Sequence, residues 1–155
     1  LNIITPSFFA LSGFRVLNGK VFDNSIHQVL VINPAMAHLF NLSPAEIVNQ
    51  KVKITILTSN LERENQLYSL EDEFEIIGVV EDGLDEPQAY LRKSDIDFPI
   101  TAYQMAKVKV RDSHSLNLVR NQLIRMGFSV SSVSDVVEQA NKVFRLVTIV
   151  LSIFG

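Results

Sequence analysis

The sequence predicts an α+β domain followed by a long C-terminal helix, and three features carry this prediction. The apolar run 29–32 is typical of a strand that is buried on both faces of a sheet, and the largely apolar segment 74–82 indicates a second buried strand. Residues 51–57 alternate between apolar and polar side chains, as a half-buried strand does. A strand, helix and strand pattern over 106–133 indicates a split βαβ-type unit, whose crossover would be right-handed if its two strands are parallel.

The N-terminal segment begins like a strand and is then divided into short pieces by Gly13 and Gly19. Three aromatic side chains, Phe8, Phe9 and Phe14, gather around the first of these glycines. Such a cluster is more often part of a core than of a ligand pocket, so we expect core packing here.

Two short segments after the first buried strand carry the signals of capped turns. Asn33 is expected to cap a short helix that Pro34 begins, because proline lacks the amide that a first helical turn leaves unpaired. Ser43 and Glu46 have the spacing of a capping box, and Asn49 suits a left-handed exit from that turn.

The middle of the chain is predicted to hold a loop and two further strands. Residues 59–73 are mostly polar, which favours an exposed loop or a hairpin tip. Gly78 lies inside the second apolar strand, where glycine usually marks a bulge or the close approach of another backbone. A surface turn is expected over 83–87, and 89–94 is a possible strand.

The C-terminal third has the clearest periodicity. A strand over 106–112 precedes a helix over 115–126, which Ser115 would cap and Gly127 would end. A short strand is then predicted over 128–133.

The last helix starts near Asp135 and Glu138, loses its polar residues along its length and contains no glycine or proline before Gly155. The preferred interpretation is that this helix starts on the domain and enters a lipid bilayer, because core helices of small domains seldom become apolar on every side. The start of the transmembrane helix is then marked by Phe144, Arg145, Leu146 and Val147. The alternative is a core helix that has been cut short.

This interpretation divides the chain into an extracytoplasmic part, 1–142, and the beginning of a membrane helix, 143–155. Arg145 lies inside the apolar run, where its long side chain would reach lipid head groups at the boundary or would simply face solvent. The apolar run itself is shorter than the roughly 20 residues that span a bilayer.

Composition argues against several functional classes. The chain of 155 residues has a net charge of −3 and scattered Lys and Arg residues, which is untypical of nucleic-acid binding. It has no cysteine, so disulfides, thiolate zinc sites and thiol nucleophiles are excluded. No Walker A loop or dinucleotide-binding glycine pattern occurs, so we expect no bound nucleotide and no cofactor.

No catalytic or metal site is predicted either. The histidines His27, His38 and His114 have the spacing of no metal motif. The acidic segments 71–73 and 81–86 lack the ligand spacing of a calcium loop and are expected to be solvated. Asp112, Ser113 and His114 are neighbours in sequence, whereas a catalytic triad needs convergence in space.

Five segments, in this order, resemble the extracytoplasmic domain of MacB-type ABC transporter permeases, which belong to the broader FtsX-like superfamily. They are PSFFALSGFRVLNGKVFD, QVLVINPAMAHLF, FEIIGVVED, the late strand and helix from KVKVRD through LNLVRNQL to GFSV, and DVVEQANKVFRLVTIVLSIFG. The chain departs from the family pattern at Asn49, where the family usually has glycine, and at Lys20, where it has arginine. The family's first membrane helix and the segment after it have no counterpart before Leu1, so a domain without its N-terminal part is expected.

The resemblance implies a fold with two parts. A smaller, variable β-rich lobe would lie within residues 1–100, and a mixed α/β lobe near the membrane would contain the βαβ-type unit within 101–142. The domain would sit on the inner (plasma) membrane and face the periplasm or the extracellular side.

The resemblance also implies a function without catalysis in this domain. Movements driven by ATP hydrolysis in a separate cytoplasmic ATPase would tilt the external domains of a permease dimer, and this mechanotransmission would move or release substrate outside the inner membrane. The implied partners are that ATPase, a second permease copy, the membrane and an envelope export partner.

Two alternatives stay open at this point. The segment 108–133 would also suit an ACT-like regulatory domain that senses a small molecule. The cell-division branch of the superfamily uses a similar external domain to recruit activators of peptidoglycan hydrolases. The transported substrate is not readable from the sequence.

Overall fold

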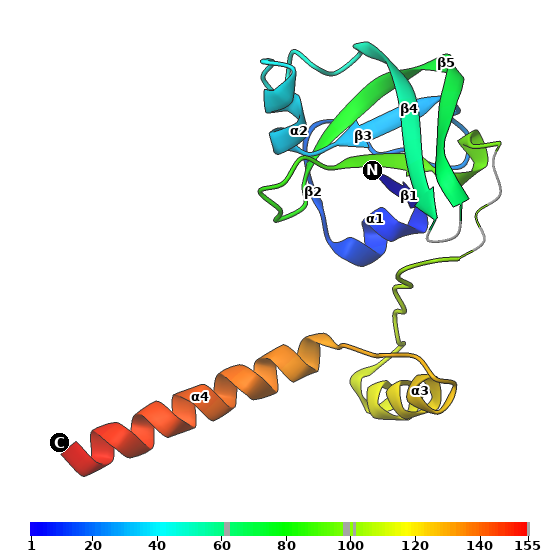
Figure 1. The fold of residues 1–155 in the computed structure, drawn as a ribbon. Helices are drawn as coiled ribbons and strands as arrows, with labels where there is room; N and C mark the ends of the chain where they lie inside the picture. The colour runs from blue at the N-terminus through cyan, green and yellow to red at the C-terminus, as the bar shows by residue number, and fades with distance from the viewer. Residues whose placement is uncertain (61–62, 98–99, 101, 155) are drawn as a thin grey trace. The chain divides into compact units, whose positions relative to one another are not determined.

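We describe a computed structural model that covers residues 1–60, 63–97, 100 and 102–154. The chain forms two compact units, Leu1–Val108 and Lys109–Gly155, which are described separately (Figure 1).

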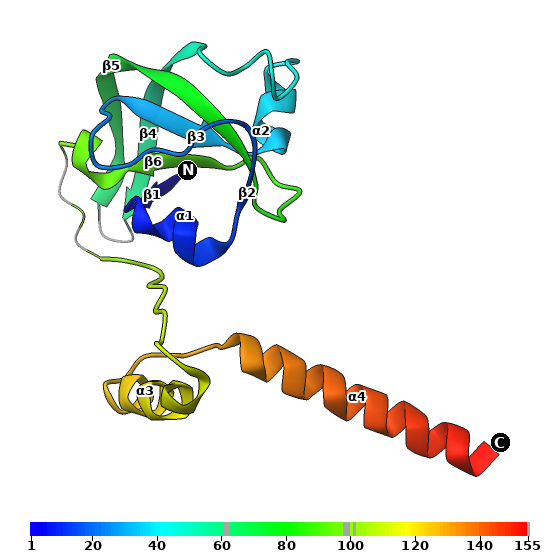
Figure 2. The same cartoon turned by 180° about the vertical axis from the view of Figure 1, so that it is seen from behind.

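The first unit is built on a mixed sheet of six strands (Figure 2). Five of them follow the order β1-β6-β3-β5-β2, and β4 pairs with β5 off this path. The pairs β1–β6 and β3–β5 are parallel, and the other pairs are antiparallel. The strands are β1 (Asn2–Ile4), β2 (Arg15–Gly19), β3 (Val29–Ile32), β4 (Lys51–Asn60), β5 (Arg63–Glu81) and β6 (Ala89–Arg92).

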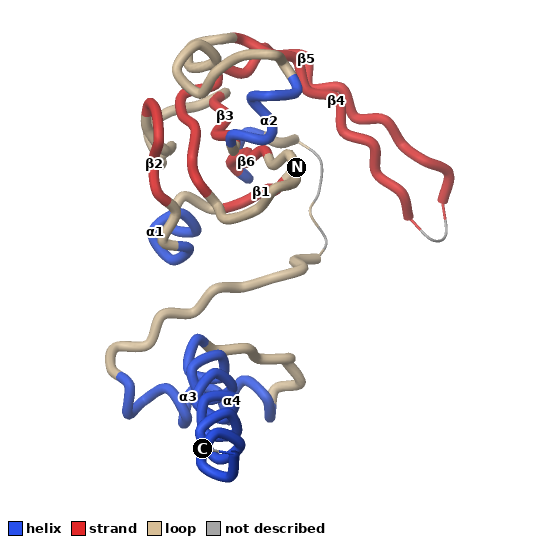
Figure 3. The backbone as a smooth tube through the Cα atoms, turned by 90° about the vertical axis from the view of Figure 1, so that its left-hand side faces the viewer, coloured by secondary structure: helices blue, strands red, loops and turns tan. Residues whose placement is uncertain are grey.

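Strand β5 spans 19 residues and belongs to two structures at once. Its C-terminal part lies between β3 and β2 inside the sheet, and its N-terminal part forms a long hairpin with β4 that projects from the sheet (Figure 3). The ladder of this hairpin extends to the pair Asn60 and Arg63.

Of the two alternatives predicted for 59–73, the exposed loop was wrong for most of the segment. The hairpin agrees with the structure, although its strands extend through most of this range. Residues 61–62 lie outside the described part. The sequence is polar here because a two-stranded ribbon that leaves the sheet exposes side chains to water, whereas the backbone ladder that makes it a strand leaves little trace in composition.

Apolar side chains on both faces of the sheet form two core clusters. Leu30 and Ile32 of β3 point into one cluster, and Val29 and Val31 point into the other, so the predicted two-sided burial of this strand is confirmed. Helix α2 (Pro34–Leu39) contributes Ala37 to the first cluster, and helix α1 (Ser7–Ser12), which the sequence did not predict as a helix, contributes Phe9 to the second. The predicted core role of the N-terminal aromatic residues is confirmed as well, because Phe9 packs 4.9 Å from the ring of Phe22.

The predicted local signals of this unit are also confirmed. The side chain of Asn33 accepts a hydrogen bond from the amide of Met36 at 3.0 Å, and the carboxylate of Glu46 accepts one from the amide of Ser43 at 3.0 Å. Asn49 has the left-handed φ of 70°.

Gly78 lies against the backbone of Lys20, as its place inside a strand suggested. A Cβ atom there would overlap the carbonyl oxygen of Lys20. The register between β3 and β5 also shifts at this point, between Leu30 and Val31.

The second unit contains two helices, α3 (Ser113–Arg125) and α4 (Val133–Phe154). Asp112 caps α3 by accepting a hydrogen bond from the amide of Ser115 at 2.8 Å, so the prediction of Ser115 as the cap was wrong by three residues. Gly127 has the left-handed φ of 90° that was expected where the helix ends.

The strands predicted over 106–112 and 128–133 are not formed, so the split βαβ-type unit is absent from the described residues. Every ladder that the structure describes lies within residues 2–92. An alternating sequence becomes a strand only where a neighbouring strand pairs with its backbone. The α+β fold class is nevertheless confirmed, because the mixed sheet with helices on it is present.

Candidate functional site

The C-terminal half of α4 exposes large apolar side chains on consecutive residues. Phe144 is 70% exposed, Leu146 64% and Val147 50%. Ile149, Val150 and Leu151 continue this surface. Successive residues are about 100° apart around a helix axis, so these apolar side chains cover more than half of the circumference of α4, and Arg145, Thr148 and Ser152 lie on the remaining side. The predicted residues Phe144 to Val147 therefore lie where this surface begins, while the side chains of Asp135 and Glu138 lie outside the described part.

The two polar side chains on this part of α4 are satisfied by the helix itself. The hydroxyl of Thr148 donates to the carbonyl oxygen of Phe144 at 2.9 Å, and the hydroxyl of Ser152 donates to that of Thr148 at 2.8 Å. Such bonds to the preceding turn let serine and threonine lie in an apolar environment without losing a partner. Between Leu146 and Ser152, the side-chain hydroxyl groups therefore need no hydrogen-bond acceptor outside the helix.

Helix α4 is continuous and straight enough to act as one element (Figure 1). It has 22 residues, which corresponds to a length of about 33 Å. Lys142 and Arg145 are exposed immediately before the apolar part, and no charged residue follows them in the helix. Within the described residues, no helix combines the length and the apolarity that crossing a bilayer takes.

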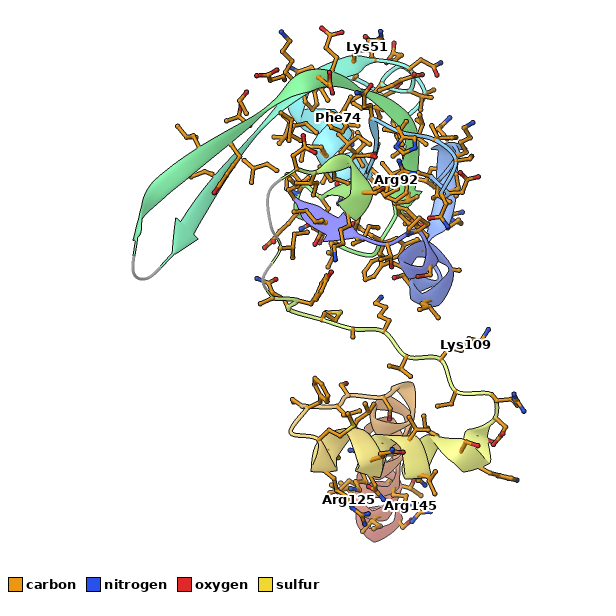
Figure 4. All side chains as sticks on the ribbon, turned by 90° about the vertical axis from the view of Figure 1, so that its right-hand side faces the viewer. Lys51, Phe74, Arg92, Lys109, Arg125 and Arg145 are labelled. Atoms are coloured by element: carbon orange, nitrogen blue, oxygen red, sulfur yellow. The ribbon has the colours of Figure 1, made fainter. Side chains whose placement is uncertain are left out.

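A buried ion pair fastens the 20–28 loop to the sheet. Arg92, which Figure 4 shows within the first unit, donates to Asp95 at 2.6 Å, to the carbonyl oxygen of Asp23 at 3.1 Å and to Nδ1 of His27 at 2.5 Å. Asp95 also accepts from the backbone amide of Gln28 at 3.1 Å. The side chains of Arg92 and Asp95 are almost completely buried. These polar groups form hydrogen bonds and an ion pair with one another, so we assign the cluster a structural role in holding the 20–28 loop.

A second polar network surrounds Asn33 at the end of β3. Besides capping α2, its side chain accepts from the amide of Gln88 at 2.9 Å and donates to the carbonyl oxygen of Glu86 at 2.8 Å. The Tyr90 hydroxyl donates to Asp82 at 2.6 Å. Burial, together with this bond to a carboxylate, raises the pKa of Tyr90 well above its ordinary value. The acidic segment 81–86 is thus tied into the sheet by hydrogen bonds.

No cluster of three or more potential metal ligands occurs among the residues that the structure describes. His27 contacts Arg92 and Asp95, whereas His38 and His114 lie on α2 and α3, in different units of the chain. A hollow of about 520 Å³ is lined by acidic residues that include Asp72 and Asp95. Arg92 compensates the charge of Asp95, and Asp72 accepts a hydrogen bond from the side-chain amide of Gln28 at 2.7 Å.

An apolar feature of the first unit was missed by the sequence analysis. Leu57 of β4 and Leu67 of β5 are direct cross-strand partners on the projecting hairpin, and they are 61% and 71% exposed. The signal was that Leu57 is an apolar residue in the outward-facing phase of the alternation over 51–57, but its partner came from a segment predicted as a loop or a hairpin tip. Exposed apolar side chains that meet across a ladder form a small contact surface.

Comparison with known proteins gives one informative result. No family model and no curated protein matches the sequence. A solved structure does match in fold: the periplasmic region of MacB from Actinobacillus actinomycetemcomitans, with a TM-score of 0.55 and 18% sequence identity over 90% of this chain. The chain corresponds to 64% of the length of that structure. The fold is therefore that of the MacB periplasmic region, as the resemblance of the five segments implied.

Proposed function

We propose that this chain, which has the fold of the MacB periplasmic region, is the extracytoplasmic domain of an ABC transporter permease subunit. In this role it couples ATP hydrolysis by a cytoplasmic ATPase to the export or release of substrate outside the inner membrane. The observation that carries the proposal is the fold match over 90% of the chain.

The surface of α4 is the second support. Burying its exposed apolar side chains in lipid is favourable by about 1.5 to 3 kcal/mol for each large side chain, and Thr148 and Ser152 make no competing demand for water. We place the start of a transmembrane helix at Phe144 to Val147, with Arg145 reaching the head groups. Residues 1–142 are then the extracytoplasmic part.

The mechanical role agrees with how the elements are built. Helix α4 has no glycine or proline at which it would bend, so a displacement of its membrane end is carried along its axis. The domain itself needs no catalytic group for this role, and we propose that it is not an enzyme. A second permease copy and the ATPase complete the working assembly.

The projecting β4–β5 hairpin is our candidate for contact with an envelope export partner. Its exposed Leu57 and Leu67 side chains form a pair that a partner surface would cover. Leu57→Glu and Leu67→Glu would weaken such a contact and leave the buried core unchanged.

The ACT-like alternative depended on a βαβ unit over 108–133, and the strands of that unit are not formed. The cell-division alternative concerns the same kind of external domain and differs in its partners. The proposal is tested by affinity purification of the full-length protein from membranes. Enrichment of a cytoplasmic ATPase together with an export partner is the expected result; an activator of peptidoglycan hydrolases without an export partner would favour the cell-division branch.

Insertion of α4 is tested separately with one labelled cysteine. The chain has no natural cysteine, so Ile149→Cys with an environment-sensitive fluorophore reports only on α4. We expect a blue-shifted emission in the presence of phospholipid vesicles, and none for the control Lys51→Cys on the sheet unit. A water-like emission from the label on α4, unchanged by the vesicles, would contradict the placement of this helix in the bilayer.

A further inference from the structure

The charges of the chain are divided unequally between its two units. The first unit carries eight Lys and Arg residues against fourteen Asp and Glu residues, a net charge of −6. The second unit carries six against three, a net charge of +3. The mild net charge of the whole chain thus conceals a basic helical unit joined to an acidic sheet unit.

Most basic residues of the second unit face solvent. Lys109, Arg111, Arg125, Lys142 and Arg145, which we call the basic set, are all exposed or nearly so. Figure 4 labels three of them, Lys109, Arg125 and Arg145. Within the part of the chain that the structure describes, no member of the basic set forms an ion pair. The acidic residue nearest in sequence to Arg111 is Asp112, whose carboxylate accepts the amide and hydroxyl of Ser115.

Exposed apolar side chains accompany these cations. Helix α3 has no buried residue, and Leu118 on it is 70% exposed. Leu118 and Arg125 lie on the same side of α3, because a separation of seven residues is about two helical turns. Phe128, just after α3, is 58% exposed. Cations beside exposed leucine and phenylalanine side chains are typical of segments that lie in the interface of a bilayer.

We infer that the basic set binds the anionic phospholipid head groups of the membrane surface. The inference rests on the proposed insertion of α4, because Lys142 and Arg145 precede the part of α4 that enters the bilayer. Charge complementarity identifies the occupant: a phosphate-bearing surface attracts the helical unit and repels the sheet unit. The exposed Leu118 and Phe128 favour a lipid surface over a purely polar polyanion, since they gain from contact with acyl chains.

The unequal distribution of charge makes an anionic membrane surface act differently on the two units. The same field attracts the basic second unit and repels the acidic first unit. Attraction and repulsion both weaken within about 8 Å to 10 Å of the surface at physiological salt, so the effect is confined to the segments next to the bilayer.

The test measures partition of the whole chain, diluted from a nonionic detergent, onto two kinds of vesicle. One is phosphatidylcholine alone, and the other contains about 30% phosphatidylglycerol. The variant K109Q/R111Q/R125Q removes three members of the basic set, all outside α4. The matched control K20Q/K51Q/K53Q removes three exposed lysines of the sheet unit and changes the net charge equally.

We expect stronger partition onto the anionic vesicles, and a weakening that grows with added salt. Each Lys or Arg near an anionic surface contributes about fivefold, so the triple variant would lose on the order of 100-fold. The control should lose far less than the triple variant, because its three lysines belong to the unit that the anionic surface repels, and a more negative sheet unit changes only that repulsion. Equal partition of parent and triple variant onto anionic vesicles would overturn the inference.

The labelled Ile149→Cys chain in the same vesicles separates this inference from the proposed function. Insertion of the label without any preference for anionic lipid refutes the basic set and leaves the transmembrane placement of α4 intact. A water-like label with partition that still depends on the basic set refutes the placement of α4 alone. Light scattering covers a further outcome: loss of self-association in the triple variant, with vesicle binding unchanged, would assign the basic set to a second copy of the chain and overturn the inference.

Discussion

Replacing Gly19 by alanine tests the close contact between β2 and β5. Gly19 has a φ of 69°, and a Cβ atom there would overlap the carbonyl oxygen of Ile77 and lie 3.0 Å from the Cα atom of Gly78. That carbonyl accepts the amide of Lys20 at 2.9 Å. The left-handed backbone costs alanine about 1 to 2 kcal/mol, forcing the two backbones apart about 1 to 3 kcal/mol, and weakening the hydrogen bond about 1 kcal/mol. We therefore expect the free energy of unfolding to fall by about 3 to 6 kcal/mol.

Gly13→Ala is the matched control for this variant. Gly13 has nearly the same φ, 67°, but nothing lies within 4 Å of its added Cβ atom. It should lose only the backbone cost of about 1 to 2 kcal/mol. Urea unfolding, followed by near-ultraviolet circular dichroism of the aromatic cluster, measures both variants. With a slope of about 1 to 2 kcal/mol/M, the midpoint of Gly19→Ala should lie about 2 M below that of Gly13→Ala; equal midpoints would refute the steric argument.

Three further predictions use the polar contacts of the structure. Asn33→Ala leaves the amide of Gln88 without its partner and removes the cap of α2, so we expect a loss of about 2 to 4 kcal/mol in the same urea titration; a loss below about 1 kcal/mol would contradict it. Tyr90 keeps its proton in the folded state above its usual pKa of 10.0 because burial and the bond to Asp82 raise that pKa. The stability of the parent chain should thus fall as the pH rises above about 10, and Tyr90→Phe should lack this part of the loss when midpoints are compared from about pH 8 to about pH 11. The pKa of Asp112 is lowered from its usual value of 3.8 by the hydrogen bond from the backbone amide of Ser115. Its stabilisation of α3 is therefore present above that usual value and is lost as the pH falls below it and through the lowered pKa, so far-ultraviolet circular dichroism should show a flatter acid transition for Asp112→Asn.

Local chemistry explains which features of the fold were predictable. The cap at Asn33 and the left-handed turn at Asn49 depend on a residue and its near neighbours, so sequence alone specifies them. The two-sided burial of 29–32 was readable for a similar reason, because a run without polar residues has no side to turn toward water. The close approach at Gly78 followed from the missing Cβ atom, although its partner, Lys20, did not.

Features that depend on distant partners were not predictable. The strand over 63–73 exists because β4 pairs with it, and its polar composition concealed that ladder. Arg92 and Asp95 are three residues apart in sequence, so their pairing is local. Their role in holding the 20–28 loop depends on the contact of Arg92 with Asp23, which is distant in sequence. The opposite error occurred at 106–112, where a strand-like alternation finds no neighbouring strand among the described residues.

The two units of this chain obtain their stability in different ways, and this difference links the proposals. The sheet unit buries aromatic and aliphatic side chains in two clusters of its own. Helix α3 buries none, and every described side chain of α4 from Asn141 to Ser152 is exposed. Helices in water gain most of their stability from packing of an apolar face. A lipid environment supplies that packing for Leu146 to Leu151 and supplies counter-charges for Lys142 and Arg145, so one surface, the bilayer, would satisfy both the apolar and the charged side chains that this unit leaves exposed.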